Sequence, residues 1–223
     1  MTLVVAAPLL CLLALVMAAV EIEIEGPYGW AEKLPTPYRV SGPLARLFGA
    51  VLGGKPLTGY NLLMFAAALL AFHLPFAFGV EWTAAAELSI LAAWVSWSAL
   101  WDVLWFLLNP SYGWRRFRRG AVWWHRRWLW RLPLDYWTAA AASLLLALLA
   151  ELIEGGGGRL AAQAMLLVAF VAWAVGAALA APLYRRLYAH THAAAFDERG
   201  RVAITPPPDE AGGGQSGADR ARQ

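Results

Sequence analysis

Residues 82–108 read WTAAAELSILAAWVSWSALWDVLWFLL, and this stretch decides the fold class. It contains no proline or glycine, and its only charged side chains are Glu87 and Asp102. A helix needs roughly 20 apolar residues to cross the hydrocarbon core of a bilayer. The stretch is therefore long enough to span a membrane, and the sequence predicts a membrane protein.

Four further segments have the same character, and the composition of the chain agrees with them. Of the 223 residues, 60% are hydrophobic and 15% are charged, whereas about 25% of the residues in soluble domains are charged. The predicted spans cover approximately 1–20, 60–79, 82–108, 136–153 and 160–183. They predict an all-α fold, a polytopic bundle of about five transmembrane helices over residues 1–203. A tail over 204–223, rich in proline and glycine, is predicted to be disordered.

The first segment has two interpretations. Its apolar run and the small residues Ala18 and Ala19 are also typical of a cleaved signal peptide. A signal peptide normally begins with basic residues, and no lysine or arginine precedes this run. We therefore expect the segment to be retained as a transmembrane helix.

Lysine and arginine are concentrated in alternate connections, which predicts the orientation of the spans. The connection between the third and fourth spans carries seven arginines and no acidic residue from Pro110 to Leu134. The connections that follow the first and fifth spans are also basic. Because basic loops remain in the cytoplasm, we expect a protein of the bacterial inner membrane with its N-terminus outside and its C-terminus in the cytoplasm.

The third predicted span carries a polar face. Glu87 and Asp102 lie about 60° apart around the helix and about 22 Å apart along it, and Ser98 and Asn109 fall in the same arc. Ionisable groups within a span are costly and usually functional, so we expect this face to point into the bundle. The two carboxylates are too distant for a general acid–base pair, which requires less than about 10 Å. For Asp102, we expect an arginine of the adjacent connection as its partner.

His73 and Glu87 are expected to pair. They lie seven residues before and seven residues after Val80, at the turn between two antiparallel spans, and so at similar depth. Two interpretations stay open: a proton-transfer pair in a membrane-embedded enzyme that acts on a lipid or isoprenoid, or a buried hydrogen bond between two polar side chains. A proton or small-solute pathway that also includes Asp102 is a third hypothesis, although five spans without an inverted repeat are unlike a secondary transporter.

Residues 114–131, WRRFRRGAVWWHRRWLWR, combine arginine and tryptophan more densely than any other part of the chain. Apolar residues recur there at spacings of three and four, which predicts an interfacial helix, or two short pieces hinged at Gly120. The residues of that apolar stripe are Trp114, Phe117, Ala121, Trp124 and Trp128. We expect the segment to bind anionic lipid headgroups or a membrane protein partner. The residues expected to bind are Arg115, Arg116, Arg118, Arg119, Trp123, Trp124, His125, Arg126, Arg127 and Trp128. A short connection between spans is a poor platform for nucleic acid, and no such role is expected.

Two further packing arrangements are expected. The acidic residues after the first predicted span are expected to pair with the arginine-rich connection; they are Glu21, Glu23 and Glu25. A row of small residues in the last span is suited to close helix packing; it consists of Ala172, Gly176 and Ala180.

The sequence identifies no cofactor and no metal site. The one cysteine, Cys11, excludes a disulfide scaffold and cysteine-based zinc or iron–sulfur sites. His190 and His192 have no further ligand cluster nearby. Our main hypothesis is a non-enzymatic multi-pass membrane protein that binds lipid or a membrane partner through its Trp/Arg-rich cytoplasmic surface, and the lipid or isoprenoid enzyme is the alternative.

Three stretches of the sequence occur together: GWAEKLPT at 29–36, WDVLWFLLNP at 101–110 followed by Tyr112 and Gly113, and WWH at 123–125. This combination resembles a group of small bacterial integral membrane proteins with no established activity. The resemblance covers about residues 20–137 and implies a membrane protein but no mechanism. The group often has an acidic residue before its aspartate and a tryptophan after LPT, where this chain has Trp101 and Pro37. These departures argue against a paired-acid site at Asp102.

Overall fold

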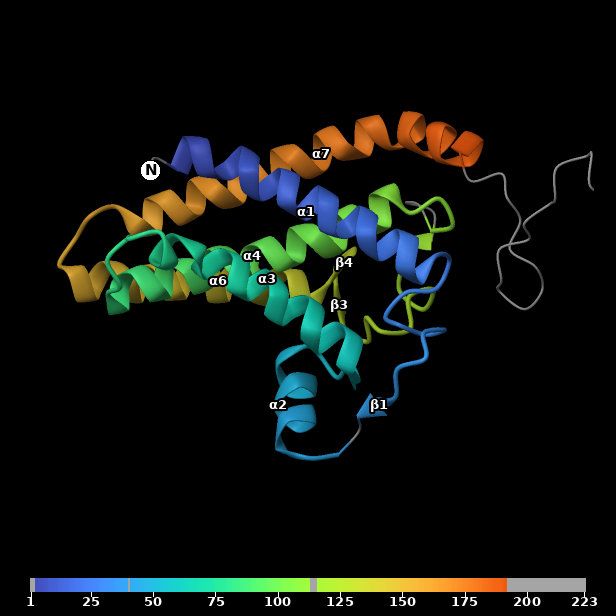
Figure 1. Cartoon of the computed structure of the whole chain (residues 1–223), viewed down its shortest axis with the longest axis horizontal. Helices are drawn as coiled ribbons and strands as arrows, with labels where there is room; N and C mark the ends of the chain where they lie inside the picture. The colour runs from blue at the N-terminus through green and yellow to red at the C-terminus, as the bar shows by residue number, and fades with distance from the viewer. Residues whose placement is uncertain (1–2, 40, 113–115, 192–223) are drawn as a thin grey trace, which may run out of the picture. The chain divides into compact units, whose positions relative to one another are not determined.

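Helices account for most of the computed structural model, which describes residues 3–39, 41–112 and 116–191, with side chains over 6–39, 41–112 and 116–188 (Figure 1). Within these residues the helices are α1 (Leu3–Glu25), α2 (Pro43–Val51), α3 (Gly59–Ala77), α4 (Ala84–Leu108), α6 (Leu134–Glu154) and α7 (Arg159–Thr191). Two short antiparallel strand pairs accompany them: β1 (Tyr38–Arg39) with β2 (Leu57–Thr58), and β3 (Trp128–Leu129) with β4 (Leu132–Pro133). The all-α prediction is confirmed.

Five of these helices are long and apolar enough to cross a membrane, as the sequence predicts. The candidate spans are Ala6–Glu25, Gly59–Ala77, Ala84–Leu108, Leu134–Glu154 and Arg159–Tyr188. Two helices extend well beyond their predicted ends: α7 continues to Thr191, and α1 continues through the acidic residues and ends before Gly26 (φ +60°). These acidic residues therefore belong to the last turns of α1 and do not follow it.

Side-chain caps define the starts of α3 and of the central helix, α4, and Asn109 with Pro110 follows the end of α4. The hydroxyl oxygens of Thr58 and Thr83 accept hydrogen bonds at 3.0 Å from the backbone N–H groups three residues ahead, which caps α3 and α4. After Leu108, the Asn109 side-chain oxygen accepts a hydrogen bond at 2.9 Å from the Ser111 N–H. Pro110 cannot continue a helix, so α4 ends where the sequence predicts.

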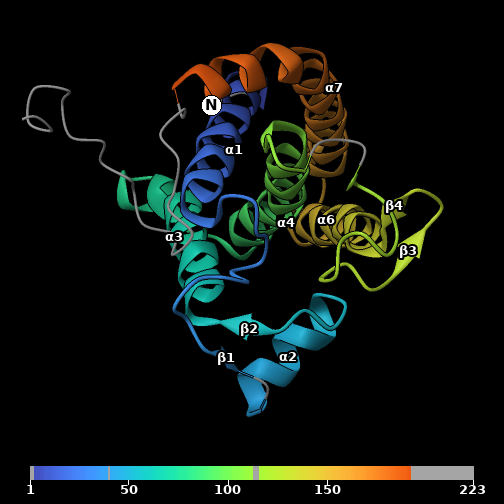
Figure 2. The same ribbon diagram turned by 90° about the vertical axis from the view of Figure 1, so that its right-hand side faces the viewer.

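The helix α4 lies between α1, α3 and α6 (Figure 2). Its buried side chains include three tryptophans, Trp97, Trp101 and Trp105. The Trp97 indole is completely buried, and its N–H donates a hydrogen bond at 2.7 Å to the Leu10 carbonyl of α1. The core of the bundle is therefore aromatic and is centred on α4.

Polar side chains connect α7 to α4 along the length of both helices. Arg159 donates to the Ser89 hydroxyl at 2.9 Å, and Gln163 donates to the Ser96 hydroxyl at 3.0 Å. Near the other end, the Arg185 guanidinium donates to the Leu107 carbonyl. The small-residue row of α7 is exposed within the described part of the chain and does not make the close packing expected from the sequence; it consists of Ala172, Gly176 and Ala180.

The chain divides into two units, 1–185 and 186–223, and the bundle is the first of them. The division falls within α7, ahead of the boundary at residue 203 that the sequence predicts. The tail that was predicted to be disordered, 204–223, and His192 lie outside the described residues.

Candidate functional site

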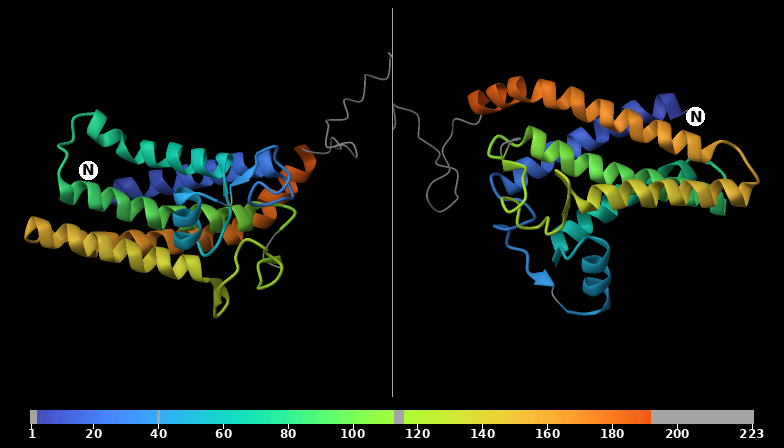
Figure 3. Two further views of the ribbon diagram at one scale, coloured as in Figure 1. Left: turned by 90° about the horizontal axis from the view of Figure 1, so that it is seen from below. Right: turned by 180° about the vertical axis from the view of Figure 1, so that it is seen from behind.

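The helices α1 and α4 finish, and α3 and α6 begin, at the same end of the bundle (Figure 3). Several ionisable side chains belong to these helix ends, among them Glu25, Asp102 and Asp135. The arginine-rich segment, which we define as residues 116–131, connects α4 to α6 at this end. It is not the predicted interfacial helix: residues 118–127 form turns and irregular backbone, and the β3–β4 hairpin follows. Gly120 has a φ of +83°, a conformation that interrupts a helix. Trp114 and Arg115, which were also assigned to that helix, lie outside the described residues.

Aromatic rings of the arginine-rich segment pack against α4 instead of facing acyl chains. Phe117 and Trp124 are buried, and their ring centroids lie 4.7 Å and 5.8 Å from that of Phe106. Trp128 is half-buried and contacts Phe117 at 5.3 Å. The spacing of these residues correctly indicates an apolar face, but that face is covered by protein. The reason is that Phe106 and its neighbours offer a better-packed partner than lipid does.

His125 is the best-buried ionisable side chain of the segment. Its side chain is 0% exposed, and each ring nitrogen faces a carboxylate: Nε2 lies 3.0 Å from Asp102 Oδ2, and Nδ1 lies 3.2 Å from Asp135 Oδ2. Only the imidazolium form donates a hydrogen bond from both nitrogens. The structure therefore places His125 between two helices as a bridge, and not at the surface where it was expected to contact headgroups.

Asp102 has a different partner from the one predicted. We expected an arginine of the adjacent connection, but the carboxylate receives hydrogen bonds from His125 and from the Tyr136 hydroxyl, at 2.5 Å. The described arginines of the segment are exposed, and the side chain that the segment turns toward Asp102 is His125. An isolated carboxylate in an apolar environment is expensive, and these two donors compensate Asp102.

Lys55 extends the arrangement on the other side of His125. Its ammonium nitrogen lies 3.0 Å from Asp135 Oδ2 and 4.6 Å from the centre of the Trp30 ring, and its side chain is 6% exposed. We call the resulting set the buried charge network; its members are Lys55, Asp102, His125, Asp135 and Tyr136. It links the loop before β2, the last two turns of α4, the arginine-rich segment and the start of α6.

Three members of the buried charge network were missed by sequence reasoning. Lys55 was counted only as a basic residue of its loop, and Asp135 and Tyr136 received no role. Asp135 follows the arginine-rich segment and opens an apolar span. An acid in the first turn of a helix is a recognisable feature, but it does not identify a partner 80 residues away in the sequence.

Glu25, at the end of α1, binds backbone instead of arginine. Its Oε1 accepts a hydrogen bond at 2.6 Å from the Ala31 N–H, and the Trp30 N–H also bonds to this carboxylate. Trp30 and Ala31 both have a left-handed backbone, with φ of 57° and 56°. Successive N–H groups in this conformation form a cradle for an anion. The expected pairing of Glu25 with the arginines is therefore wrong.

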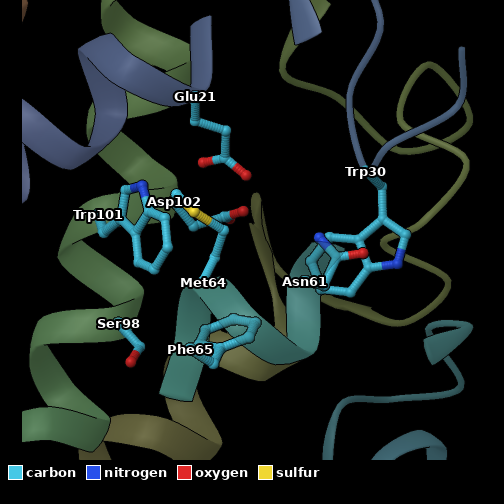
Figure 4. Close-up of a pocket in the computed structure, with 8 residues that line it drawn as sticks. All are labelled: Glu21, Trp30, Asn61, Met64, Phe65, Ser98, Trp101 and Asp102. Atoms are coloured by element: carbon cyan, nitrogen blue, oxygen red, sulfur yellow. The ribbon is translucent and has the colours of Figure 1, made fainter. Parts of the chain in front are cut away.

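Glu21 and Asp102 meet across a small cavity between α1, α3 and α4 (Figure 4). Its volume is about 20 Å³, and Ser98, Asn61 and Trp101 are among the residues that line it. A volume of roughly 10–15 Å³ is enough for one water molecule. The cavity therefore has room for one water molecule between two carboxylates, and it is too small for a lipid or another organic substrate.

The predicted polar face of α4 is divided among separate contacts. Ser98 lines the cavity with Asp102, and its hydroxyl donates to the Trp94 carbonyl at 2.9 Å. Asn109 is buried, and its side-chain amide donates at 2.8 Å to the Gly26 carbonyl, which connects α4 to the end of α1. Glu87 lies at the opposite end of α4. Glu87 is not among the residues that line the cavity at Asp102.

The structure brings His73 and Glu87 together, as the spacing predicts. Nε2 of His73 lies 2.9 Å from Glu87 Oε1, and the two side chains are 28% and 27% exposed. Nδ1 of His73 lies 2.7 Å from the Leu69 carbonyl, and the Trp82 indole donates to Glu87 Oε2 at 3.0 Å. Both nitrogens of His73 are thus occupied, as are both carboxylate oxygens of Glu87.

The arginines of the segment remain exposed. None of those described forms an ion pair with an acidic side chain within residues 6–39, 41–112 and 116–188; they are Arg116, Arg118, Arg119, Arg126, Arg127 and Arg131. Trp123 is also exposed, and its indole donates at 3.3 Å to Glu32. Glu32, in the loop that follows α1, therefore pairs with an indole and not with an arginine of the segment. The guanidinium groups are left for solvent or a ligand.

Two tyrosines outside the spans flank the same surface. Burial, together with the negative charge of Glu32, raises the pKa of the Tyr38 hydroxyl and that of the Tyr112 hydroxyl. Both hydroxyls therefore stay neutral at physiological pH. The ring of Tyr38 contacts Trp123 edge-on at 6.3 Å, and Arg116 lies 6.0 Å from the centre of the Tyr112 ring.

No protein family, curated protein or solved structure matches this chain. The described residues contain no group of three or more His, Cys, Asp or Glu side chains that is arranged to hold a metal ion. A function must therefore be argued from the geometry of this chain: a buried charge network at one end of a five-helix bundle, covered by an exposed set of arginines.

Proposed function

We propose that this multi-pass protein binds the anionic headgroups of membrane lipids through the arginine-rich segment. The observation that carries the proposal is the set of six described arginines in one connection between spans, all exposed and none paired with an acid of the described residues. A basic residue near an anionic membrane surface contributes about 1 kcal/mol of attraction. Six arginines next to two spans therefore favour binding to a negatively charged membrane surface.

The acids at the same end of the bundle do not cancel this positive charge. Asp102 and Asp135 are compensated by His125 and Lys55, and Glu25 is compensated by backbone N–H groups. None of these acids pairs with a described arginine of the segment, so the segment keeps the positive charge of its arginines. The division between inner pairs and outer arginines supports a surface that attracts anions.

The segment is also held in place, which favours binding over a passive loop. His125 joins it to both α4 and α6, and Phe117 and Trp124 pack on Phe106. A ligand that binds a rigid surface loses less affinity to the ordering of that surface. The buried charge network and the aromatic contacts thus act as the support for the arginines.

An enzyme of lipid or isoprenoid chemistry is the second candidate, and the 2.9 Å contact between His73 and Glu87 is the observation that favours it. A proton-transfer pair needs one group that is free to reach the substrate. The Leu69 carbonyl and the Trp82 indole already occupy the remaining polar atoms. A substrate would have to displace one of these contacts, so we rank lipid binding first.

We further propose that the arginine-rich segment faces the cytoplasm of a bacterial cell, with the N-terminus outside and the C-terminus inside. Arg39 and Arg46 belong to the loop that follows α1, at the same end of the bundle as the segment. The positive-inside rule assigns such an end to the cytoplasmic leaflet, which also carries anionic lipids. Orientation and lipid binding are thus consistent proposals.

The test compares lipid retention in two matched double variants. The purified protein in detergent is mixed with phosphatidylglycerol or phosphatidylcholine, and native mass spectrometry counts the lipids retained. We expect a preference for phosphatidylglycerol that falls several-fold in Arg118→Gln/Arg119→Gln. A smaller fall is expected in Arg39→Gln/Arg46→Gln, which removes the same charge from β1 and α2, outside the arginine-rich segment. Equal retention of both lipids by the parent protein, or capture of an acidic protein in place of lipid, contradicts the proposal.

A further inference from the structure

The turn of the β3–β4 hairpin contains an unusual residue. Leu129 pairs with Leu132, so Trp130 and Arg131 form a two-residue turn. Trp130 has a φ of 53°, in the left-handed region that favours glycine. Two-residue hairpin turns with this conformation at their first position usually place glycine there, and a bulky residue in it is a conformational outlier.

Burial and hydrogen bonding explain the other left-handed residues of the described part that are not glycine. Those residues are Trp30 and Ala31, which are buried and bind the Glu25 carboxylate through their backbone. Trp130 is 80% exposed, and its one aromatic contact with the described residues is an edge-on approach to Trp137, with 5.2 Å between the ring centroids. Packing inside the protein therefore does not account for a tryptophan at this turn.

The position of Trp137 shows what the turn lies next to. Trp137 is in the first turn of α6, which begins at Leu134 and is one of the five candidate spans. The Trp130 ring therefore lies beside the place where the chain enters the membrane. Leu129 and Trp137 are also exposed, so the turn has an apolar edge. Arg127 and Arg131 flank this edge and are exposed.

We propose that Trp130 and Trp137 form a lipid-contacting edge whose indole rings lie at the boundary between headgroups and acyl chains. Arg127 and Arg131 bind the phosphate of the same phospholipids. Indole rings prefer this depth because one edge donates a hydrogen bond while the rest is apolar. The proposal rests on the proposed function and specifies it, since it assigns the lipid contact to the hairpin turn and α6 and not to Trp124 or His125, which are buried.

Charge and location together favour a phospholipid over a protein partner. The turn adjoins a span, so acyl chains lie beside it in any membrane that the span crosses. The flanking side chains are cations without an acidic partner in the described part of the chain. An anionic headgroup neutralises the charge of the arginines, and the acyl region buries the apolar part of the exposed indole rings. The strain at Trp130 is then retained because the ring serves lipid contact.

Trp130→Asn separates this role from a structural one, because asparagine tolerates the left-handed region better than tryptophan does. We expect the melting temperature in detergent without added lipid to equal or exceed that of the parent protein. The rise in melting temperature on adding phosphatidylglycerol is expected to fall to about half or less. Trp130→Phe, which keeps a ring beside Trp137, is expected to lose part of this rise and covers the case in which Trp130→Asn does not fold.

The matched control is Phe78→Asn, which removes an exposed aromatic ring from the turn between α3 and α4, at the other end of the bundle. Its phosphatidylglycerol response is expected to equal that of the parent. A Trp130→Asn variant with a lower melting temperature and an unchanged lipid response overturns the inference, because it assigns Trp130 a structural role. If Arg118→Gln/Arg119→Gln loses the response while Trp130→Asn and Trp130→Phe keep it, this inference fails and the proposed function stands. If the parent itself does not respond to phosphatidylglycerol, the proposed function fails.

Discussion

His125 and Asp102 belong to different parts of the chain, and their side chains meet with 3.0 Å between Nε2 and Oδ2. The other nitrogen of the same ring reaches Asp135, at the start of α6. One imidazole thus joins the arginine-rich segment to two spans. Because it is completely buried, this side chain is not available to bind lipid itself, and its part in the proposed lipid binding is to hold the arginine-rich segment in place.

Replacement of His125 is expected to destabilise the bundle strongly. His125→Ala removes the buried ring that contacts both Asp102 and Asp135, and leaving a buried charge without its partner typically costs about 3–5 kcal/mol. His73→Ala is the matched control, because that ring pairs with one carboxylate near the end of α3 and is 28% exposed. Because His73 contacts one carboxylate and His125 contacts two, we expect the smaller loss for His73→Ala. Thermal unfolding in detergent measures both losses, and losses of equal size contradict a structural role for the buried charge network.

Lys55 and Asp135 are expected to act as one unit. In a double-mutant cycle with Lys55→Met and Asp135→Asn, the double variant should be more stable than the sum of the single losses implies. The coupling should be about 1–3 kcal/mol, since contacting groups in one network interact on this scale. Denaturation of the four proteins under one detergent condition gives the coupling. Additive single losses would show that the 3.0 Å contact contributes nothing to stability.

Gly29 is expected to tolerate no larger side chain. A Cβ atom at this position meets Trp124 ring atoms at 2.1–2.8 Å, well inside van der Waals contact. Gly29→Ala must therefore displace the Trp124 ring from Phe106, and we expect a loss of about 1–3 kcal/mol, as for other overpacked cores. Gly176→Ala is the control: it lies within α7 with open space around it, and alanine in a helix is expected to stabilise it by about 0.5–1 kcal/mol. A neutral Gly29→Ala variant contradicts the packing described for Trp124.

The orientation of the bundle can be measured by cysteine labelling. The natural Cys11 is buried in α1, so a new cysteine at an exposed position carries the signal. We expect a membrane-impermeant maleimide to label Val80→Cys in intact cells and Arg118→Cys only after permeabilisation. Val80 lies in the turn between α3 and α4, and Arg118 lies in the arginine-rich segment. The reverse pattern places the arginines outside the cell and removes the argument from the cytoplasmic leaflet.

Features that depend on a single stretch of chain were predicted from the sequence. Each span is long and apolar by itself, and the helix breakers Asn109 and Pro110 act on their own neighbours, so both were found where expected. The pairing of His73 with Glu87 was also predicted, because a short turn leaves two antiparallel helices little freedom of register. In each case the deciding interactions are local.

Contacts between distant segments were not predicted. An aromatic stripe at helical spacing looks the same whether lipid or protein covers it, so the arginine-rich segment was given the wrong secondary structure. The partner of Asp102 was assigned by charge alone, and the nearest cations in the sequence are arginines. The choice of His125 depends on which side chain the folded segment turns inward, and that orientation depends on Phe106, Tyr136 and Asp135 together.

The sequence by itself therefore determined that this is a protein with helices apolar enough for a membrane. It also determined the five candidate spans and the concentration of arginine in one connection. These follow from hydrophobic content, length and charge, which are properties of each stretch alone. Only the tertiary structure decided which charges are compensated and which remain available. Burial of a charge is acceptable only when a partner from elsewhere in the chain lies within hydrogen-bonding distance, and that condition selected His125 and Lys55 for the interior and left the arginines at the surface.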